Sequence, residues 1–366
     1  MINRLIFANL RSRPMRSLVS VVAVAIEVIL ILLIVGLVNG MVNDHRARVE
    51  GLGADIMVMA GNGSMFAELS GNTLPVKLAD VFAKVPGVAA VAPVGYNLIG
   101  GLEAVGGIDL DAFRAVSGGF RFVQGRAFTP DSYEVIVDNL EASSKHYRVG
   151  QTLTLFGQPF TLVGIFEQGM GARVYIPLKV LDQYSGSPGK VSAFYIRTNK
   201  GVDKALVVNQ LKRMAPAERV ISMSDYLTLF TANAVSPALP IFQRVMVGIA
   251  MAIGFLVIFL SLYTSVLERT REIGILKALG ASRGYIVRVI LRESELLAVV
   301  GIVAGTAVAY LIWHGLTRIY PTLTIEFTWK WIGLAALIAL ASSTVGALYP
   351  AFKAAGQDAI AALAYE

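Results

Sequence analysis

Four long apolar runs divide this chain and decide most of its architecture. Each approaches or exceeds the ~20 residues that a helix needs to cross the hydrocarbon core of a bilayer. Because lipid offers the backbone no hydrogen-bond partners, each run is expected to form a helix. Charged residues make up only 16% of the chain, against about 25% in a soluble domain. The runs are residues 18–41, 244–267, 294–314 and 329–349.

The positive charge of the chain lies in two short segments beside these runs. Residues 1–17 hold four arginines and no acid, and residues 267–293 hold six bases and three acids, which together account for the whole net charge of +7. Lys and Arg concentrate in the cytoplasmic loops of membrane proteins. Both segments are therefore predicted to be cytoplasmic, and their placement argues against nucleic-acid binding. The first run is longer than the roughly 7–15 apolar residues of a signal peptide, so a retained anchor is expected.

Four spans with a cytoplasmic start place a large domain outside the cytoplasm, between the first and second spans. Both termini are then cytoplasmic. The predicted segments are an amphipathic basic helix over 1–17, a first span over 18–41, an extracytoplasmic domain over 42–240, a stalk and second span over 241–267, a cytoplasmic helix and linker over 268–293, a third span over 294–314, an outer loop over 315–328, a fourth span over 329–349 and a cytoplasmic tail over 350–366.

The extracytoplasmic domain has the pattern of a mixed α/β fold. Residues 193–198, 202–214 and 219–223 are predicted to form a strand, a helix and a strand. Strands predicted at 152–156 and 160–166 flank the sequence Gly157-Gln158-Pro159, which is typical of a hairpin. We predict an α/β lobe built from residues of about 45–115 and 190–235, with a β-rich lobe, about 120–188, inserted between its two parts.

The segment between the second and third runs is charged and helix-forming. No proline occurs from residue 241 to residue 279, so a near-continuous helical path with a bend at the charged residues is expected. Gly280 can take the left-handed conformation that ends a helix, and Ser282 can cap the next one.

Two faces of this predicted helix can be distinguished. Ile273, Leu276 and Lys277 share one face at i, i+3 and i+4, and Ile275 and Leu279 share another. From these residues alone, an amphipathic loop lying on the lipid headgroups is an open alternative to a functional helix.

Polar and small residues occur inside two of the runs. Glu27 lies well inside the first run, where an ionisable group usually faces the bundle interior or a cavity. Three hypotheses are open for it: a protonated glutamate bonded to a neighbouring helix, a polar lining for a lipid-like substrate, and a proton relay. Gly301 and Gly305 form a G-x-x-x-G pattern in the third run. They are expected to pack closely, either within the chain or at a subunit interface.

Catalytic and metal-binding patterns are missing from the sequence. It contains no cysteine, its three histidines are scattered, and no H-E-x-x-H or comparable spacing occurs. Residues 185–190 do not satisfy the phosphate-loop pattern. We therefore expect a non-enzymatic chain that binds no cofactor or metal. If ATP drives this protein, another chain is expected to bind it.

The sequence Glu-Arg-Thr-Arg-Glu-Ile-Gly-Ile-Leu-Lys-Ala-Leu-Gly-Ala-Ser over residues 268–282 resembles the coupling-helix signature of MacB/FtsX-type (type VII, mechanotransmission) ABC transporter permeases. Residues 9–20 are similar to the basic N-terminal helix of this family, residues 349–366 to its C-terminal tail, and the strands of 134–177 to its outer domain. The order of four spans, with a large domain after the first, agrees with the family independently.

The resemblance implies a homodimeric permease of the bacterial inner membrane, paired with two ATPase subunits that bind ATP and magnesium. In this family the ATPases grip the coupling helix, and their closure and release is passed to the outer domains. The resemblance implies that these ATPase subunits are separate chains, although in MacB itself the ATPase is fused at the N-terminus and this sequence begins at the basic helix. On this resemblance the ATPase-coupling residues are Glu268, Arg271, Glu272, Ile273, Gly274, Leu276, Lys277, Leu279 and Gly280.

The leading hypothesis is the permease subunit of an export or mechanotransmission complex. A periplasmic adaptor of the membrane-fusion type and membrane lipids are further expected partners. One alternative is an FtsX-like membrane regulator or scaffold that controls an extracytoplasmic enzyme. Another is a lipoprotein-releasing permease, which needs a lipid-binding groove between the first two spans. None of the three specifies a substrate.

Overall fold

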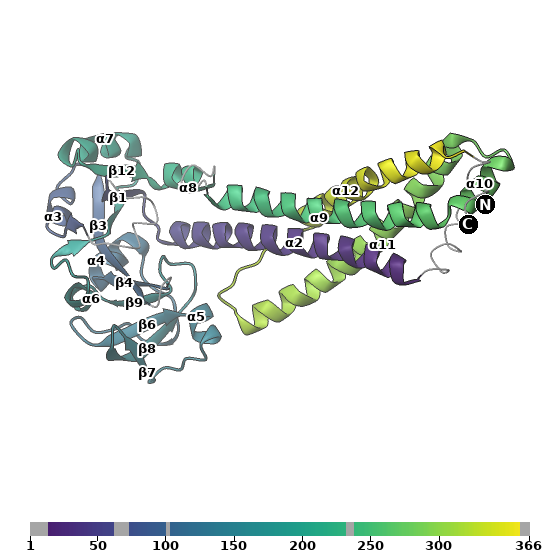
Figure 1. Cartoon of the computed structure of the whole chain (residues 1–366). Helices are drawn as coiled ribbons and strands as arrows, with labels where there is room; N and C mark the ends of the chain where they lie inside the picture. Colours follow the sequence, from purple (N-terminus) through teal and green to yellow (C-terminus); the bar gives the residue numbers. More distant parts are fainter. Residues whose placement is uncertain (1–13, 62–72, 100–102, 232–237, 359–366) are drawn as a thin grey trace. The chain divides into compact units, whose positions relative to one another are not determined.

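The chain forms two compact units in the computed structural model (Figure 1). The structure describes residues 14–61, 73–99, 103–231 and 238–358. The helical unit takes its described residues from Met1–Gly40, Ala238–Arg318 and Ile325–Glu366. The second unit, which we call the α/β domain, takes its described residues from Met41–Pro237 and Ile319–Thr324.

Four long helices and one short helix build the helical unit. In the part of the chain that the structure describes, four helices are long and apolar enough to cross a membrane. The α/β domain lies between the first and the second of them in sequence, so the predicted fold class is confirmed. The helices are α2 (Pro14–Gly51), α9 (Ala238–Glu268), α10 (Thr270–Ala278), α11 (Arg283–Ile319) and α12 (Trp329–Gly356).

Several helix boundaries differ from the predicted ones. The predicted basic helix over 1–17 lies almost entirely outside the described residues. The described part of α2 begins at Pro14. The predicted path from 241 to 279 is broken at Arg269, whose φ of −106° and ψ of 16° separate α9 from α10. The fourth helix continues through Pro350 to Gly356, so the start of the predicted tail is helical, and 359–366 lie outside the described residues.

Small residues allow the long helices to approach one another closely. A Cβ atom added to Gly301 of α11 would lie 2.6 Å from Cβ of Val24 in α2, and one added to Gly305 would lie 2.7 Å from the carbonyl oxygen of Ala25. Glycine permits such backbone contact in lipid. The structure therefore places both glycines of the G-x-x-x-G pattern against a helix of the same chain.

One mixed sheet of ten strands forms the centre of the α/β domain. Its order is β12-β1-β11-β3-β4-β9-β6-β8-β5, with β7 paired to β8, and a separate two-stranded sheet pairs β2 with β10. The strands are β1 (Ile56–Ala60), β2 (Leu74–Pro75), β3 (Val88–Ile99), β4 (Glu103–Ile108), β5 (Phe122–Gly125), β6 (Glu134–Asp138), β7 (Thr152–Leu155), β8 (Gln158–Phe166), β9 (Val174–Pro177), β10 (Lys190–Val191), β11 (Ala193–Thr198) and β12 (Glu218–Ser222). The helices are α3 (Leu78–Phe82), α4 (Leu110–Ser117), α5 (Asn139–Ser144), α6 (Leu178–Tyr184), α7 (Lys204–Met214) and α8 (Met223–Thr231).

Both faces of this sheet are covered by apolar side chains. Successive side chains of a strand point to opposite faces, and β1 divides its residues accordingly. Ile56 and Val58 belong to a buried cluster with residues of α3 and α7, whereas Met57 and Met59 belong to a cluster with residues of α4. Strand β1 is therefore apolar at every one of these positions, because neither of its faces meets water.

The two predicted lobes share this one sheet. Strands β12, β1, β11, β3 and β4 come from the predicted α/β lobe, and β9, β6, β8, β5 and β7 come from the predicted β-rich lobe. The parallel pair β4–β9, from Val105 opposite Val174 to Ile108 opposite Pro177, joins them. Local sequence patterns do not encode pairing between distant segments, so the lobes were not expected to be continuous.

The hairpin between β7 and β8 turns one residue earlier than the sequence predicts. Leu155 pairs with Gln158, so Phe156 and Gly157 form the two-residue turn, with φ of 53° and 76°. Positive φ at both central residues is typical of the type I′ turn, whose twist matches the strands it connects. The predicted turn at Gly157-Gln158-Pro159 is corrected accordingly, and Pro159 lies in β8.

Candidate functional site

The segment 268–282 forms a short helix with a defined stop at each end. Arg269 interrupts the helix before it. After it, Gly280 has φ of +92°, and its N–H donates to the carbonyl of Lys277 at 3.0 Å. The N–H of Ala281 donates to the carbonyl of Leu276 at 3.0 Å, which completes a Schellman motif. The predicted glycine stop is present, and α10 is an element separate from α9.

The helix that follows is capped as the sequence predicts. The hydroxyl of Ser282 accepts a hydrogen bond from the backbone N–H of Tyr285 at 3.2 Å. This satisfies one of the free N–H groups in the first turn of α11. The two helices are therefore joined by a short, ordered connection.

One side of α10 faces the interior of the helical unit. Ile273 is buried in a cluster that includes Leu262, Val266 and Ile286, and Gly274 is also buried. The Nζ atom of Lys277 donates to the carbonyl oxygens of Ala355, at 3.0 Å, and Gln357. These contacts fasten α10 to the end of α12.

The other side of α10 is exposed. The predicted coupling residues therefore differ in their exposure. Glu268, Arg271, Glu272, Leu279 and Gly280 are exposed, and Leu276 and Lys277 are half-buried. Ile273 and Gly274 are buried within the chain, so the structure gives them a supporting role and no surface for a partner. Periodicity identifies the residues that share a face but not the face that is covered.

The predicted set also omits an exposed residue. Ile275 is 45% exposed and Leu279 is 81% exposed. The two lie one turn apart on the same face. This spacing is the sequence signal that could have added Ile275 to the predicted set. Large apolar side chains presented to solvent at this spacing are typical of a surface that contacts another protein or a membrane.

A buried ion pair holds the start of α10 to α11. The Nη1 atom of Arg269 lies 3.5 Å from Oε2 of Glu293, and their side chains are 12% and 10% exposed. The pair borders a pocket of about 310 Å³ among α9, α10 and α11, lined mainly by apolar side chains such as Val266, Ile273 and Ile290. Sequence reasoning missed this pair, because Arg269 and Glu293 lie in different helices.

Glu27 is bonded to a neighbouring helix. Its side chain is 1% exposed, and the hydroxyl of Ser342 in α12 donates to its two carboxyl oxygens at 2.9 and 3.1 Å. Gly254 of α9 lies against the same carboxyl group, since a Cβ atom there would be 1.9 Å from Oε2. This arrangement is the one that the first of the three hypotheses for Glu27 predicts, a bond to a neighbouring helix.

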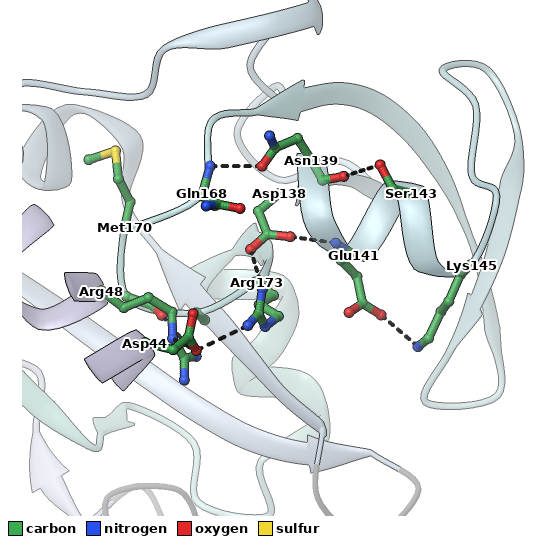
Figure 2. Close-up of polar contacts among 12 residues, drawn as sticks. Asp44, Arg48, Asp138, Asn139, Glu141, Ser143, Lys145, Gln168, Met170 and Arg173 are labelled. Carbon is green, nitrogen blue, oxygen red and sulfur yellow. Dashed lines mark hydrogen bonds and ion pairs between the residues drawn. The ribbon is translucent and has the colours of Figure 1, made fainter. Parts of the chain in front are cut away.

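A second cluster of charges lies within the α/β domain (Figure 2). The guanidinium of Arg173 lies between two carboxylates, 3.0 Å from Asp44 in α2 and 3.1 Å from Asp138 at the end of β6. Arg48 forms an ion pair with Asp44 at 3.0 Å. Arg173 therefore links the last turns of α2 to the strands that the sequence assigned to the β-rich lobe.

Asp138 is the most buried member of this cluster, with its side chain 1% exposed. It also caps α5, because its Oδ1 accepts the backbone N–H of Glu141 at 2.6 Å. Burial raises the pKa of its carboxyl group. The hydrogen bond from the Glu141 N–H and the charge of Arg173 act in the opposite direction and lower it.

Backbone contacts reinforce the link between α2 and the rest of the domain. The N–H of Gly171 donates to the carbonyl of Arg48 at 3.0 Å, and a Cβ atom on Gly51 would lie 1.7 Å from the carbonyl oxygen of Gly169. His45 Nε2 is 3.0 Å from the hydroxyl of Tyr226 in α8. The end of α2 is therefore held by two separate parts of the domain, which sequence reasoning did not foresee.

No group of three or more His, Cys, Asp or Glu side chains placed to hold a metal ion occurs among the described residues.

Two family models match the chain in succession. The MacB-like periplasmic core domain matches residues 17–214, more than half of the chain, and the FtsX-like permease C-terminal domain matches residues 244–359. The chain is 26% identical over 314 residues to the macrolide export ATP-binding/permease protein MacB of Escherichia coli K12, covering 78% of this chain and 47% of that protein. It is 25% identical over 255 residues to the uncharacterized ABC transporter permease YknZ of Bacillus subtilis, covering 62% of this chain and 59% of that protein.

The chain thus spans about half the length of the curated relatives it matches. Among solved structures, the periplasmic region of MacB from Actinobacillus actinomycetemcomitans is 17% identical, with a TM-score of 0.38, and the match covers 50% of this chain and 95% of that one. The two family models together cover nearly all of the first helix, most of the α/β domain and nearly all of the three later spans. This chain belongs to the MacB/FtsX-type family of ABC transporter permeases.

Proposed function

We propose that this permease couples ATP hydrolysis in a partner chain to movement of its own α/β domain. Two copies of the permease pair with two ATPase subunits, which bind Mg-ATP, in a bacterial inner membrane. The helix α10 and both termini lie on the cytoplasmic side, and the α/β domain lies on the opposite side. The charge distribution supports this orientation, since the net charge of +7 resides in the segments 1–17 and 267–293.

The observation that carries the proposal is the exposed face of α10. It combines charged residues, Arg271 and Glu272, with apolar ones, Ile275 and Leu279, on a helix with a fixed stop at each end. A short helix with ordered ends presents these side chains at defined positions. Such a surface suits a soluble partner that pushes and pulls on it.

Two anchors support transmission of force from α10 into the membrane helices. The ion pair of Arg269 with Glu293 connects the start of α10 to α11, and Lys277 connects its last turn to α12. Coupling between distant sites is carried by packed side chains and networks of hydrogen bonds and ion pairs, and these two contacts supply such a connection.

The attachment of α2 supports transmission to the α/β domain. The helix is continuous from Pro14 to Gly51, and Arg173 joins its last turns to β6. A displacement of α2 therefore acts directly on the sheet. The name of the Escherichia coli relative describes macrolide export by that protein; for this chain we propose export or mechanical work on the far side of the membrane, with no particular substrate.

The test uses the full chain reconstituted in nanodiscs with the ATPase that co-purifies with it. We expect Glu272→Lys and Leu279→Asp each to reduce permease-stimulated ATPase activity by tenfold or more, because each alters the exposed face of α10. Asp80→Lys is the matched control, since Asp80 is an exposed acid on α3 of the α/β domain. The control is expected to leave the stimulation unchanged.

Retention of the ATPase chain during purification separates docking from coupling. If both α10 variants keep wild-type stimulation and wild-type retention of the ATPase, the assignment of α10 as the docking helix is wrong. Labelling of single cysteines at positions 279 and 80, from each side of sealed vesicles, tests the orientation independently.

A further inference from the structure

A basic groove lies between the first turns of α11 and the last turn of α12. Its volume is about 600 Å³, and three exposed arginines, Arg283, Arg288 and Arg292, line its α11 side. Val287 and Leu291 of α11 are half-buried between them, and Phe352 of α12, 63% exposed, forms part of the opposite side. The groove therefore combines positive charge with an apolar surface.

Little negative charge offsets these arginines. Among the described residues that line the groove, Glu295 is the only acid. Its carboxylate lies 3.9 Å from Nε of Arg292, and the two side chains are 48% and 60% exposed. An exposed pair at that distance is weak and easily exchanged for another anion. Arg283 and Arg288 have no ion pair with any residue that the structure describes.

Two of these three arginines also lie within reach of the lipid headgroups. The apolar part of α11 begins at Leu296, directly after Glu295. At ~1.5 Å per residue, Arg292 and Arg288 lie about 6 and 12 Å before that point along the helix, and Arg283 lies about 20 Å before it. The polar layer on each side of the hydrocarbon core is roughly 5–8 Å thick. Arg292 thus lies within the headgroup layer, Arg288 can reach it with its long side chain, and Arg283 lies beyond it.

We propose that this groove binds the headgroup phosphate of an anionic phospholipid from the adjacent leaflet. A guanidinium group donates two parallel hydrogen bonds to a phosphate, and Arg288 and Arg292 carry this contact. The apolar surface of Phe352, Val287 and Leu291 receives the glycerol and the upper acyl carbons, which a free phosphate ion does not possess. Basic pockets between membrane helices recognise anionic headgroups in this way. The proposal rests on α11 crossing the membrane and does not depend on coupling to an ATPase.

The test is native mass spectrometry of the full chain, released from nanodiscs with equal amounts of phosphatidylglycerol and phosphatidylcholine. We expect the wild type to retain phosphatidylglycerol preferentially. Arg288→Ala with Arg292→Ala is expected to weaken this preference about 30-fold, from the usual contribution of two arginines near a membrane surface. Arg213→Ala with Arg219→Ala is the matched control, since both arginines are exposed in the α/β domain. That variant loses the same charge and should keep the preference.

Two further variants separate binding from folding. Arg288→Lys with Arg292→Lys keeps the charge and should keep part of the preference, whereas Phe352→Ala keeps every arginine and should lose part of it. Persistence of the full preference in the double alanine variant overturns the proposal. The proposal is also overturned if inorganic phosphate alone protects the wild type against heat as well as phosphatidylglycerol does. That result would identify a site for a free anion. A double alanine variant that retains the lipid but loses a co-purifying ATPase would make the groove a protein contact and also overturn the proposal.

Discussion

The Arg173 cluster and the α10 segment both use charge to fix a helix. The Arg173 cluster is buried, and we call it the closed region. The α10 segment has an exposed face, and we call it the open region. Arg173 is 14% exposed and contacts two carboxylates at 3.0 and 3.1 Å. At α10 the Arg269–Glu293 pair is 3.5 Å apart and borders a pocket of about 310 Å³. The exposed face of α10 extends to Leu279, which is 81% exposed.

This difference indicates different tasks for the two regions. A buried arginine with two carboxylates has few alternative arrangements, because moving it leaves a buried charge without a partner. A helix that borders a pocket and has an exposed apolar edge can shift and can be covered by another chain. We infer that the α/β domain holds α2 as a fixed attachment, while α10 is the adjustable contact. The predictions below test that contrast in order of decreasing effect on stability.

Removing the arginine of the closed cluster is expected to have the largest effect. Arg173→Ala leaves Asp138 buried without its cation, and breaking a buried pair in this way usually costs about 3–5 kcal/mol. Chemical denaturation of the purified full chain in detergent measures the loss. Hydrogen exchange of the amides of β6 and α5, which should accelerate, localises it.

Arg121→Ala is the control for this substitution. Its side chain is 87% exposed and its Nη1 atom lies 4.0 Å from Oε2 of Glu167, and exposed pairs usually contribute about 0–1 kcal/mol. A loss for Arg173→Ala no larger than that for Arg121→Ala would remove the distinction between closed and open regions.

Replacing a glycine by alanine should change stability in opposite directions in the two regions. Gly51→Ala places a Cβ atom 1.7 Å from the carbonyl oxygen of Gly169, and backbone cannot yield as a flexible side chain can. Overpacking of this kind typically costs about 1–3 kcal/mol. Gly284→Ala, in the first turn of α11, meets nothing within 4 Å and should be neutral or stabilising by up to about 1 kcal/mol. The melting temperatures of the two variants test this prediction. Equal shifts in the two variants would contradict it.

The sequence predicts the open region better than the closed one, for a physical reason. The end of α10 at Gly280 and the cap at Ser282 depend on residues a few positions apart, so local chemistry predicts both. The Arg173 cluster brings together three segments that are distant in the chain, and this requires the complete sheet. Ile273 illustrates the boundary between the two cases. Its face was identified by periodicity, but its burial depends on α9 and α11.

Acid should weaken an exposed contact of the α/β domain in a narrow pH window. Hydrogen bonds from Arg126 lower the pKa of Glu134 from 4.5 to about 2. Because this carboxyl pKa is lower in the folded state, its contribution to stability is present above about pH 4.5 and is lost as pH falls through about 2. Glu134→Gln should therefore be less stable than the wild type at pH 7 and equally stable well below pH 2. A difference that persists well below pH 2 would show that packing, and not charge, carries this contact.

The smallest effect on stability is expected for Leu279→Asp, at the exposed edge of α10. Substitutions of exposed residues usually change stability by no more than about 0.5 kcal/mol. Ile273→Asp is the matched contrast, since it introduces the same charge on the same helix at a position that is 9% exposed. Burying an unpaired carboxylate is costly, so this variant should unfold at a clearly lower temperature. If Leu279→Asp destabilises the purified chain as much as Ile273→Asp does, then Leu279 is already covered in the folded protein. In that case the edge of α10 is a structural contact, and a partner ATPase has to engage the permease at another surface.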